Sequence, residues 1–256
     1  MLKKYSDEQG IDFFSTVDFK ENIELLVKLR CHSIKIGSAD VNHFSLIRQA
    51  AKTGMCIQLD TGMATLGEIE RAVDVVRSEG NENIIIHHCP SGYPARLDSI
   101  NLKIIKTLKK MFSYPIAFSD HTPGNEMDIA AVVLGANMVE KTITEDRMTP
   151  SVEHVMSIEP NEMKDFVRTI REVEIGLGTG RRVMHSEEIK KRNALRRRAF
   201  LIEPAKKGKR LGDCKVEFRR PGFGIHSDQF EFLKNNVLVR NIDSGQMIQF
   251  SDLSWK

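Results

Sequence analysis

The sequence predicts an α/β protein built on a parallel sheet, followed by a smaller and mostly β domain. Three observations lead to this class. Short apolar runs recur along the first two thirds of the chain, segments with helical spacing lie between them, and polar residues gather where each apolar run ends. Strand and helix alternating at nearly constant spacing indicate βα units. Polar strand ends are where a β/α barrel or an open α/β sheet places its site.

Six apolar runs are expected to form buried strands because each is short and rich in apolar residues. In chain order they cover residues 11–14, 33–38, 55–60, 83–88, 115–119 and 137–142. Helices are expected between them. Leu25, Leu26 and Leu29 form one apolar face, and a capping box at 65–68 opens a helix with Ile69 on its apolar face. Further helices are expected over 100–112, 126–136 and 160–174.

The pattern changes after residue 175. The glycine-rich segment 176–180 follows a helix and no strand, so it indicates a helix end and a linker and not a dinucleotide-binding loop. From Arg198 onward the segments are short and strand-like. We therefore expect domains at 1–178 and 198–256, joined by a linker at 179–197 that is long enough to place the second domain against another subunit.

The composition gives no sign of a nucleic-acid or membrane partner. The formal net charge is +3, from 38 basic and 35 acidic residues, so neither nucleic acid nor a membrane is required as a partner. The basic stretch 181–198 lacks interleaved aromatic residues and fits a solvated linker. The four cysteines are scattered, and the amino terminus lacks the apolar centre of a signal peptide. Reduced thiols and a cytoplasmic location are expected.

The strand ends carry the candidate chemistry. His121, which ends the run AFSDHT, is a candidate metal ligand because imidazole suits first-row divalent metals. Of His87 and His88, alternation places one side chain inward. Lys35 lies inside an apolar strand, where a lysine is unfavourable unless it meets an anion such as phosphate or carboxylate. Hydroxyl donors that could join it are Thr16, Ser38, Ser91 and Ser119.

A set of motifs resembles the sialic acid (N-acetylneuraminate) synthases, a group that includes the legionaminic and pseudaminic acid synthases. The motifs are KIGSAD (35–40), LDTGMATLGEI (59–69), HHCPSGYPA (87–95), FSDHTPGN (118–125), VEKTITEDR (139–147) and FRRPGFG (218–224). They occur in the family's order over essentially the whole chain. The second domain resembles the antifreeze-like (SAF) domain of these enzymes.

The resemblance implies a (β/α)₈ TIM-type barrel carrying a SAF domain, assembled as a domain-swapped homodimer. The family condenses phosphoenolpyruvate with the open-chain aldehyde of an N-acetylated amino sugar such as N-acetylmannosamine. A divalent metal, usually Mn²⁺ with Mg²⁺ or Co²⁺ as alternatives, polarises the aldehyde. The products are a sialic acid-type nonulosonic acid and phosphate.

The resemblance also assigns residues. Lys35 and His121 would act in catalysis, with Asp40 in place of the family's usual Glu beside the sugar. Phosphoenolpyruvate would be held by Thr16, Lys35, Ser38, Ser91 and Ser119. Tyr93 and Glu153 would line the sugar pocket, and Arg220 would reach into the partner subunit's site.

Three departures from the family pattern stand out. Thr142 occupies the position of the second metal-binding His, and Asp60 replaces a phosphate-contacting Ser, where a carboxylate would repel phosphate. We hypothesise that Asp60 supplies the metal ligand that Thr142 cannot. The first strand of this sequence matches the family's third, so the barrel is expected to lack its first two βα units.

Alternatives remain at this point. The acceptor sugar could be that of a legionaminic or pseudaminic acid synthase. The chain could be a non-catalytic fragment that binds a sugar or a partner subunit. Lys35 could also serve as the Schiff-base amine of a barrel aldolase.

Overall fold

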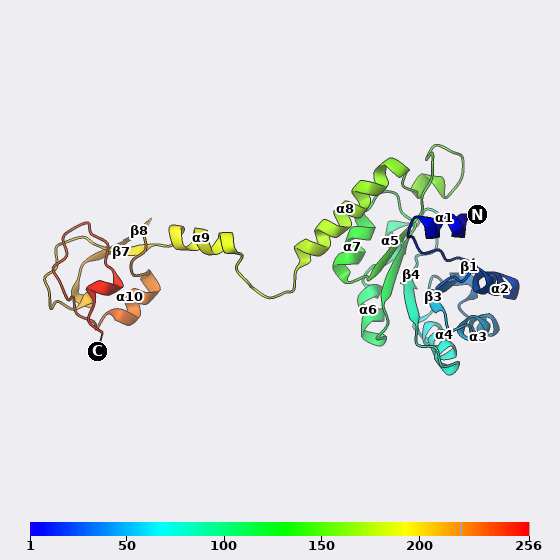
Figure 1. Cartoon of the computed structure of the whole chain (residues 1–256), viewed down its shortest axis with the longest axis horizontal. Coiled ribbons are helices and arrows are strands. Elements are labelled where there is room, and N and C mark those ends of the chain that lie inside the picture. Colours follow the sequence, from blue (N-terminus) through cyan, green and yellow to red (C-terminus); the bar gives the residue numbers. More distant parts are fainter. Residues whose placement is uncertain (221, 256) are drawn as a thin grey trace. The chain divides into compact units, whose positions relative to one another are not determined.

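The computed structural model describes residues 1–220 and 222–255. The chain forms two compact units, Met1–Thr179 and Gly180–Lys256, called unit 1 and unit 2 below. Unit 1 is a curled parallel sheet of six strands, a half-barrel whose strands follow one another in chain order (Figure 1). These strands are β1 (Thr16–Val17), β2 (Ser33–Ile36), β3 (Cys56–Asp60), β4 (Ile84–His88), β5 (Ile116–Asp120) and β6 (Met138–Lys141).

Helices lie along the outer face of this sheet (Figure 1). Unit 1 contains α1 (Leu2–Glu8), α2 (Lys20–Lys28), α3 (Phe44–Ala51), α4 (Leu66–Ser78), α5 (Leu97–Ile100), α6 (Ile104–Met111), α7 (Glu126–Leu134) and α8 (Pro160–Leu177). The capping box predicted for α4 is present, since Thr65 accepts a hydrogen bond from the Glu68 backbone N–H and Glu68 accepts one from the Thr65 backbone N–H.

The apolar core of unit 1 lies between the sheet and the helices. Ile34 and Ile36 of β2 and Leu59 of β3 are fully buried in one cluster with Ile47 of α3 and Val76 of α4. Strand side chains alternate between the two faces. The residues between these apolar positions therefore point to the inner face of the half-barrel, which is why the site is built from alternate strand residues.

Five of the six predicted strands are confirmed to within two residues at either end, but the first was placed wrongly. Residues 11–14 form no strand, and Ile11 and Phe14 remain exposed. The strand is Thr16–Val17, where Thr16 pairs with Lys35. These two residues form the strand because they pair with the edge of β2, and not because the local sequence is apolar.

Two helix predictions also needed correction. The buried face of α2 is Ile23 and Leu26, whereas Leu25 and Leu29 are exposed. The helix predicted over 100–112 is divided into α5 and α6, because Asn101 adopts a left-handed conformation with φ of 46°. A single continuous helix cannot pass through such a residue.

Unit 2 has its own apolar core. Strands β7 (Arg198–Leu201) and β8 (Val216–Arg219) pair antiparallel, and α10 (Ser227–Leu233) contributes Phe230 to the core. The predicted linker contains α9 (Ser186–Leu195), which starts with a capping box between His185 and Glu188 and buries none of its side chains. The identification of residues 198–256 as an antifreeze-like domain stays a prediction.

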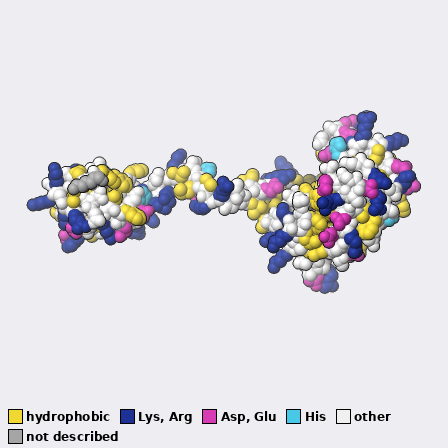
Figure 2. All heavy atoms as spheres, turned by 90° about the horizontal axis from the view of Figure 1, so that it is seen from below, with side chains coloured by type: hydrophobic (Ala, Val, Ile, Leu, Met, Phe, Trp, Pro, Cys, Tyr) yellow, Lys and Arg dark blue, Asp and Glu magenta, His cyan; other side chains and the backbone are white. Residues whose placement is uncertain are grey.

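The surface of unit 1 mixes charges of both signs. Figure 2 shows Lys and Arg side chains interspersed with Asp and Glu on the face in view. Cys31, Cys56, Cys89 and Cys214 are free thiols. Within residues 1–220 and 222–255, no helix combines the length and the apolar character that crossing a membrane requires.

Candidate functional site

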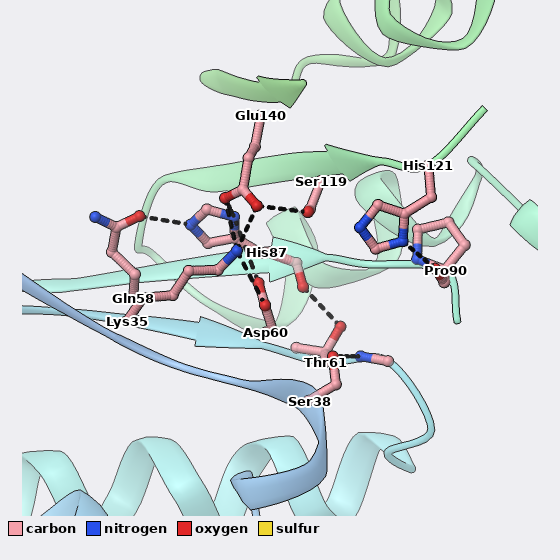
Figure 3. Close-up of polar contacts among 11 residues, drawn as sticks. Lys35, Ser38, Gln58, Asp60, Thr61, His87, Pro90, Ser119, His121 and Glu140 are labelled. Atoms are coloured by element: carbon pink, nitrogen blue, oxygen red, sulfur yellow. Dashed lines mark hydrogen bonds and ion pairs between the residues drawn. The ribbon is translucent and has the colours of Figure 1, made fainter. Parts of the chain in front are cut away.

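Sheet register brings a set of polar side chains together on the inner face of the half-barrel. Lys35 of β2 pairs with Gln58 of β3, Asp60 of β3 pairs with His87 of β4, and Ser119 of β5 pairs with Glu140 of β6. Each of these residues occupies an alternate position of its strand, so all point inward. Figure 3 shows Lys35, Asp60, His87, Ser119 and Glu140 directed toward one another.

Lys35 is the centre of this group. Its ammonium donates to both carboxylate oxygens of Glu140, with Nζ–O distances of 2.5 and 2.6 Å, and lies 3.1 Å from Oδ2 of Asp60. The side chain of Lys35 is only 8 % exposed. Burying an ammonium in this way is tolerated because two carboxylates surround it.

The three charged groups of this cluster change one another's pKa values. Burial disfavours the charged form of Lys35, but Asp60 and Glu140 outweigh it and raise the pKa of the ammonium above 10.5. Burial raises the pKa of Asp60 to about 6, and the attraction of Lys35 offsets this only in part. Burial also opposes charge on Glu140, yet Lys35 holds its pKa below 4.5. At neutral pH the cluster is therefore an ammonium between two carboxylates.

His87 forms the floor of the cluster and is fully buried. Gln58 donates through Nε2 to Ser33 Oγ, so its Oε1 accepts from Nε2–H of His87 at 2.9 Å. This assigns the proton to Nε2 and leaves Nδ1 as a bare acceptor, 3.7 Å from Oδ1 of Asp60 and 3.7 Å from Oε2 of Glu140. Burial, aided by Lys35, lowers the pKa of His87 to about 4, so the ring is neutral at pH 7.

His121 lies at the end of β5 with its ring held from two sides. Nδ1 donates to the carbonyl of Pro90 at 3.2 Å, and the ring of Tyr93 stacks on it with centroids 4.4 Å apart. Burial lowers its pKa below the ordinary 6.5. Nε2 is therefore an unprotonated nitrogen at pH 7, available to a ligand. Figure 3 shows His121 and Pro90 beside the Lys35 group.

The loops that follow β2, β3 and β4 meet closely at Gly62. A Cβ on Gly62 would lie 2.5 Å from the Cys89 carbonyl oxygen and 2.8 Å from the hydroxyls of both Ser38 and Ser91. The Gly62 N–H also donates to Ser38 Oγ at 3.1 Å. Only glycine fits this position, and the absence of a side chain leaves room for both predicted hydroxyl donors beside it.

The predicted residues of unit 1 share a single cavity of about 530 Å³. Those that line it are Thr16, Lys35, Ser38, Asp40, Asp60, Ser91, Tyr93, Ser119, His121 and Glu153, together with Thr142. Arg220 lies in unit 2, directly after β8, and lines a different cavity with Arg196, Arg197 and His226. The structure thus brings the barrel residues together, whereas the role predicted for Arg220 in a partner subunit stays a prediction.

The residues predicted to bind a metal do not form a complete metal site by themselves. His121 offers one imidazole nitrogen, but Asp60 is engaged by Lys35. In residues 1–220 and 222–255, no three or more His, Cys, Asp or Glu side chains are arranged to hold a metal ion. Oγ1 of Thr142 is buried without a hydrogen-bond partner, and a hydroxyl is a weaker ligand than imidazole. The metal roles of His121 and Asp60 stay predictions.

Sequence reasoning missed two members of the cluster, Glu140 and Gln58. Glu140 binds Lys35 with both oxygens and accepts a hydrogen bond from Ser119 at 3.0 Å. The signal was available, because each is a polar residue at an alternate position of an apolar strand, as Lys35 is. Alternation also left the choice between His87 and His88 open: His87 faces the site, whereas His88 contacts the Ile100 carbonyl oxygen of α5.

Comparisons with known proteins agree with this architecture. An N,N'-diacetyllegionaminic acid synthase of Campylobacter jejuni is 33 % identical over 94 % of this chain and 72 % of its own length. A pseudaminic acid synthase of the same species is 30 % identical over 96 % of this chain and 72 % of its own length. The crystal structure of the N-acetylneuraminic acid synthetase of Leptospira borgpetersenii is 34 % identical, with a TM-score of 0.69 over 76 % of this chain and 69 % of that chain.

These relatives are sialic acid-type synthases, and the Leptospira borgpetersenii structure shares the fold of this chain over 76 % of its length. Residues 1–182, which comprise all six parallel strands and the whole cavity, match the NeuB family. The chain belongs to the NeuB family.

Proposed function

We propose that this chain is a sialic acid synthase-type enzyme that condenses phosphoenolpyruvate with an N-acetylated amino sugar, giving a nonulosonic acid and phosphate. One observation carries the proposal. Residues from all six strand ends line a single cavity whose inner wall holds a charged, buried lysine. A buried ammonium with serine and threonine hydroxyls around it can bind an anionic substrate.

In this proposal each group has a defined task. Lys35 donates hydrogen bonds to phosphoenolpyruvate, and the hydroxyls that surround it are those of Thr16, Ser38, Ser91 and Ser119. Asp40, Tyr93 and Glu153 line the same cavity and would orient the sugar. Arg220 of a second copy would contact the sugar's N-acyl group in a domain-swapped dimer.

A divalent metal, Mn²⁺ in the first instance with Mg²⁺ or Co²⁺ as alternatives, would supply Lewis-acid polarisation of the sugar aldehyde. His121 is suited to hold it, because Nδ1–H is fixed on the Pro90 carbonyl and Nε2 is left free of a proton. Stacking against Tyr93 fixes the plane of the ring. Orienting an imidazole through its second nitrogen is the usual way in which proteins prepare a metal ligand.

The aldolase alternative is weakened by the charge of Lys35. A Schiff base requires a neutral amine, and the carboxylates of Asp60 and Glu140 raise the pKa of Lys35. Borohydride trapping with a carbonyl substrate is expected to give no adduct. The alternative of a non-catalytic binding fragment is favoured by Asp60 and Thr142, the two cavity residues that depart from the expected pattern.

The test of the proposal is phosphate release from phosphoenolpyruvate by the full chain with Mn²⁺ and N-acetylmannosamine. Parallel reactions omit the metal or the sugar, or replace the sugar with the legionaminic or pseudaminic acid precursors. Release that requires both metal and one of the sugars is the expected result, and the sugar that works identifies the acceptor. A folded sample that releases no phosphate with any of the three sugars would leave the binding-fragment alternative in its place.

The hypothesis that Asp60 is a metal ligand has its own test. Mn²⁺ affinity of the Asp60→Ser variant, measured by calorimetry, is expected to fall below that of the unmodified chain. Unchanged affinity would refute the hypothesis. Light scattering of the full chain tests the proposed homodimer, for which the mass should be twice that of one 29.1 kDa chain.

A further inference from the structure

The hydrogen-bonding capacity of Lys35 is already filled. An ammonium has three N–H donors. Two of them bind the carboxylate oxygens of Glu140 at 2.5 and 2.6 Å, and the third faces Asp60 Oδ2 at 3.1 Å. A phosphate group that approaches Lys35 therefore has to compete with a carboxylate for at least one N–H.

The charge of the cavity wall opposes a phosphate dianion as well. Five carboxylates line the cavity, those of Asp18, Asp40, Asp60, Glu140 and Glu153. Lys35 is the one lysine among the described residues that line it, and no arginine is among them. His121 adds no charge at pH 7 because its pKa is lowered. Like charges repel each other, and the repulsion is stronger from a buried carboxylate than from one that solvent screens.

Asp60 and Glu140 differ in how firmly other groups hold them. Glu140 accepts a hydrogen bond from Ser119, and its side chain is 34 % exposed. Asp60 is 9 % exposed, and its Oδ1 is buried without a hydrogen-bond partner. The bare Nδ1 of His87 lies 3.7 Å from that oxygen and offers no proton. Among the described residues, Lys35 is thus the one lysine or arginine that forms an ion pair with Asp60.

We propose that Asp60 is a specificity-determining residue, a resident counter-anion of Lys35 that weakens the binding of a phosphate group in this cavity. The inference rests on the proposed function in one respect, namely that Lys35 is the group that holds the phosphate-bearing substrate. The size of this effect depends on the charge of the ligand. A ligand with two negative charges is repelled by Asp60 more strongly than a ligand with one, so a carboxylate monoanion is disfavoured less than phosphate is.

The test is a calorimetric titration of the full chain with inorganic phosphate, in the presence of a chelator so that no metal contributes. Asp60→Asn removes the charge at nearly constant shape. Phosphate is expected to bind at least about tenfold more tightly to this variant than to the unmodified chain. Titration with pyruvate, which carries a single charge, is expected to show a smaller gain.

Asp18→Asn is the matched control. It makes the same chemical change in the same cavity, but Asp18 follows β1, is exposed, and has no ion pair with Lys35. Solvent screens an exposed charge, so its removal is expected to change phosphate affinity by less than about twofold. Asp60→Ser serves as a second variant, and circular dichroism confirms that each protein is folded.

Three results would overturn the inference. The first is phosphate affinity in both Asp60 variants that equals or falls below that of the unmodified chain. The second is an equal gain in the Asp18 variant, which would assign the effect to the general charge of the cavity. The third is the absence of phosphate binding in every variant. None of these measurements involves turnover, so an inactive but phosphate-binding chain would count against the proposed function and leave this inference standing.

Discussion

Unit 1 contains two buried clusters with the same charged groups, one lysine and two carboxylates, on opposite faces of the same sheet. The inner cluster is Lys35, Asp60 and Glu140. The outer cluster is Lys141 of β6 with Asp120 of β5 and Asp128 of α7, where Lys141 Nζ lies 2.5 Å from Asp120 and 3.4 Å from Asp128. Two neighbouring residue pairs of β5 and β6 contribute to the two clusters. Ser119 pairs with Glu140, and Asp120 pairs with Lys141. Alternation sends one pair inward and the next outward.

The two clusters differ in access to solvent, and their chemistry follows from that. Side chains of the outer cluster are 0–3 % exposed, whereas Glu140 of the inner cluster is 34 % exposed. Burial together with Asp120 raises the pKa of Asp128 to about 8, so the outer cluster keeps a proton and is neutral at pH 7. The inner cluster keeps both carboxylates charged beside a cavity. A sealed cluster of this kind has no access to a ligand, whereas an open one can exchange partners with a ligand.

The outer cluster also connects to the site through the chain. Lys141 donates to the Thr122 carbonyl at 2.6 Å, and Asp120 accepts from the backbone N–H and the hydroxyl of Thr122. His121 lies between these two residues in sequence. The cluster therefore fixes the turn that presents the imidazole to the cavity.

The largest predicted effect is a difference in the free energy of unfolding between variants of Lys141 and Lys35. Lys141→Met leaves Asp120 buried without a counter-charge and is expected to lower the free energy of unfolding by about 3–5 kcal/mol. Lys35→Met is expected to lower it less, because Glu140 can be hydrated from the cavity. Urea unfolding of both variants measures the difference, with Lys106→Met on the exposed face of α6 as the control. Equal losses in the Lys35 and Lys141 variants would remove the distinction between the clusters.

A second prediction uses the proton on Asp128. Its pKa is about 8 in the folded chain and near its ordinary 3.8 when unfolded. Between these values the unfolded state releases the proton and the folded state retains it, so stability falls as the pH rises from about 4 to about 8. Asp128→Asn cannot ionise in either state and mimics the protonated carboxyl. It should be more stable than the unmodified chain at pH 8, by about 1.4 kcal/mol for each unit by which folding raises the pKa, with the difference vanishing toward pH 4.

Thermal unfolding of the two proteins at several pH values between 4 and 8 measures this convergence. The exposed Asp98→Asn variant serves as the control for loss of a carboxylate without burial. A constant difference at all pH values would mean that Asp128 is ionised in the folded protein. In that case the two clusters would carry the same charge, and only their solvent access would distinguish them.

The fold was largely predictable from the sequence because most strands of the sheet are marked by their own run of apolar residues. The isoleucines 84–86 of β4, for example, are a short apolar run that marks a buried strand in the sequence itself. Thr16–Val17 was missed because a two-residue edge strand is defined by its partner, β2, and not by its own composition. The division between α5 and α6 depends on the left-handed backbone of Asn101, which no periodicity reveals.

The site was predictable to the extent that a charge interrupts an apolar strand. Lys35 met that criterion and was found, whereas Glu140 met it and was overlooked. The ion pair of Asp60 with Lys35 could not be predicted from the sequence. A carboxylate at a position where the resemblance predicts phosphate binding does not reveal which group it contacts. The outer cluster lay beyond sequence reasoning for the same reason. Its third member, Asp128, comes from a helix whose packing against β6 is a tertiary event.

The smallest predicted effect concerns the metal and returns to the inner face. Thr142 lines the cavity with His121, and its hydroxyl is buried without a partner. Thr142→His would place a second imidazole there and is expected to raise Mn²⁺ affinity about tenfold, or about 1.4 kcal/mol. Thr142→Val, which removes the hydroxyl and adds no ligand, should leave the affinity unchanged. If Thr142→His gains nothing, or gains equally in a His121→Gln background, His121 is not a metal ligand, and the inner face would be a site for charged substrates alone.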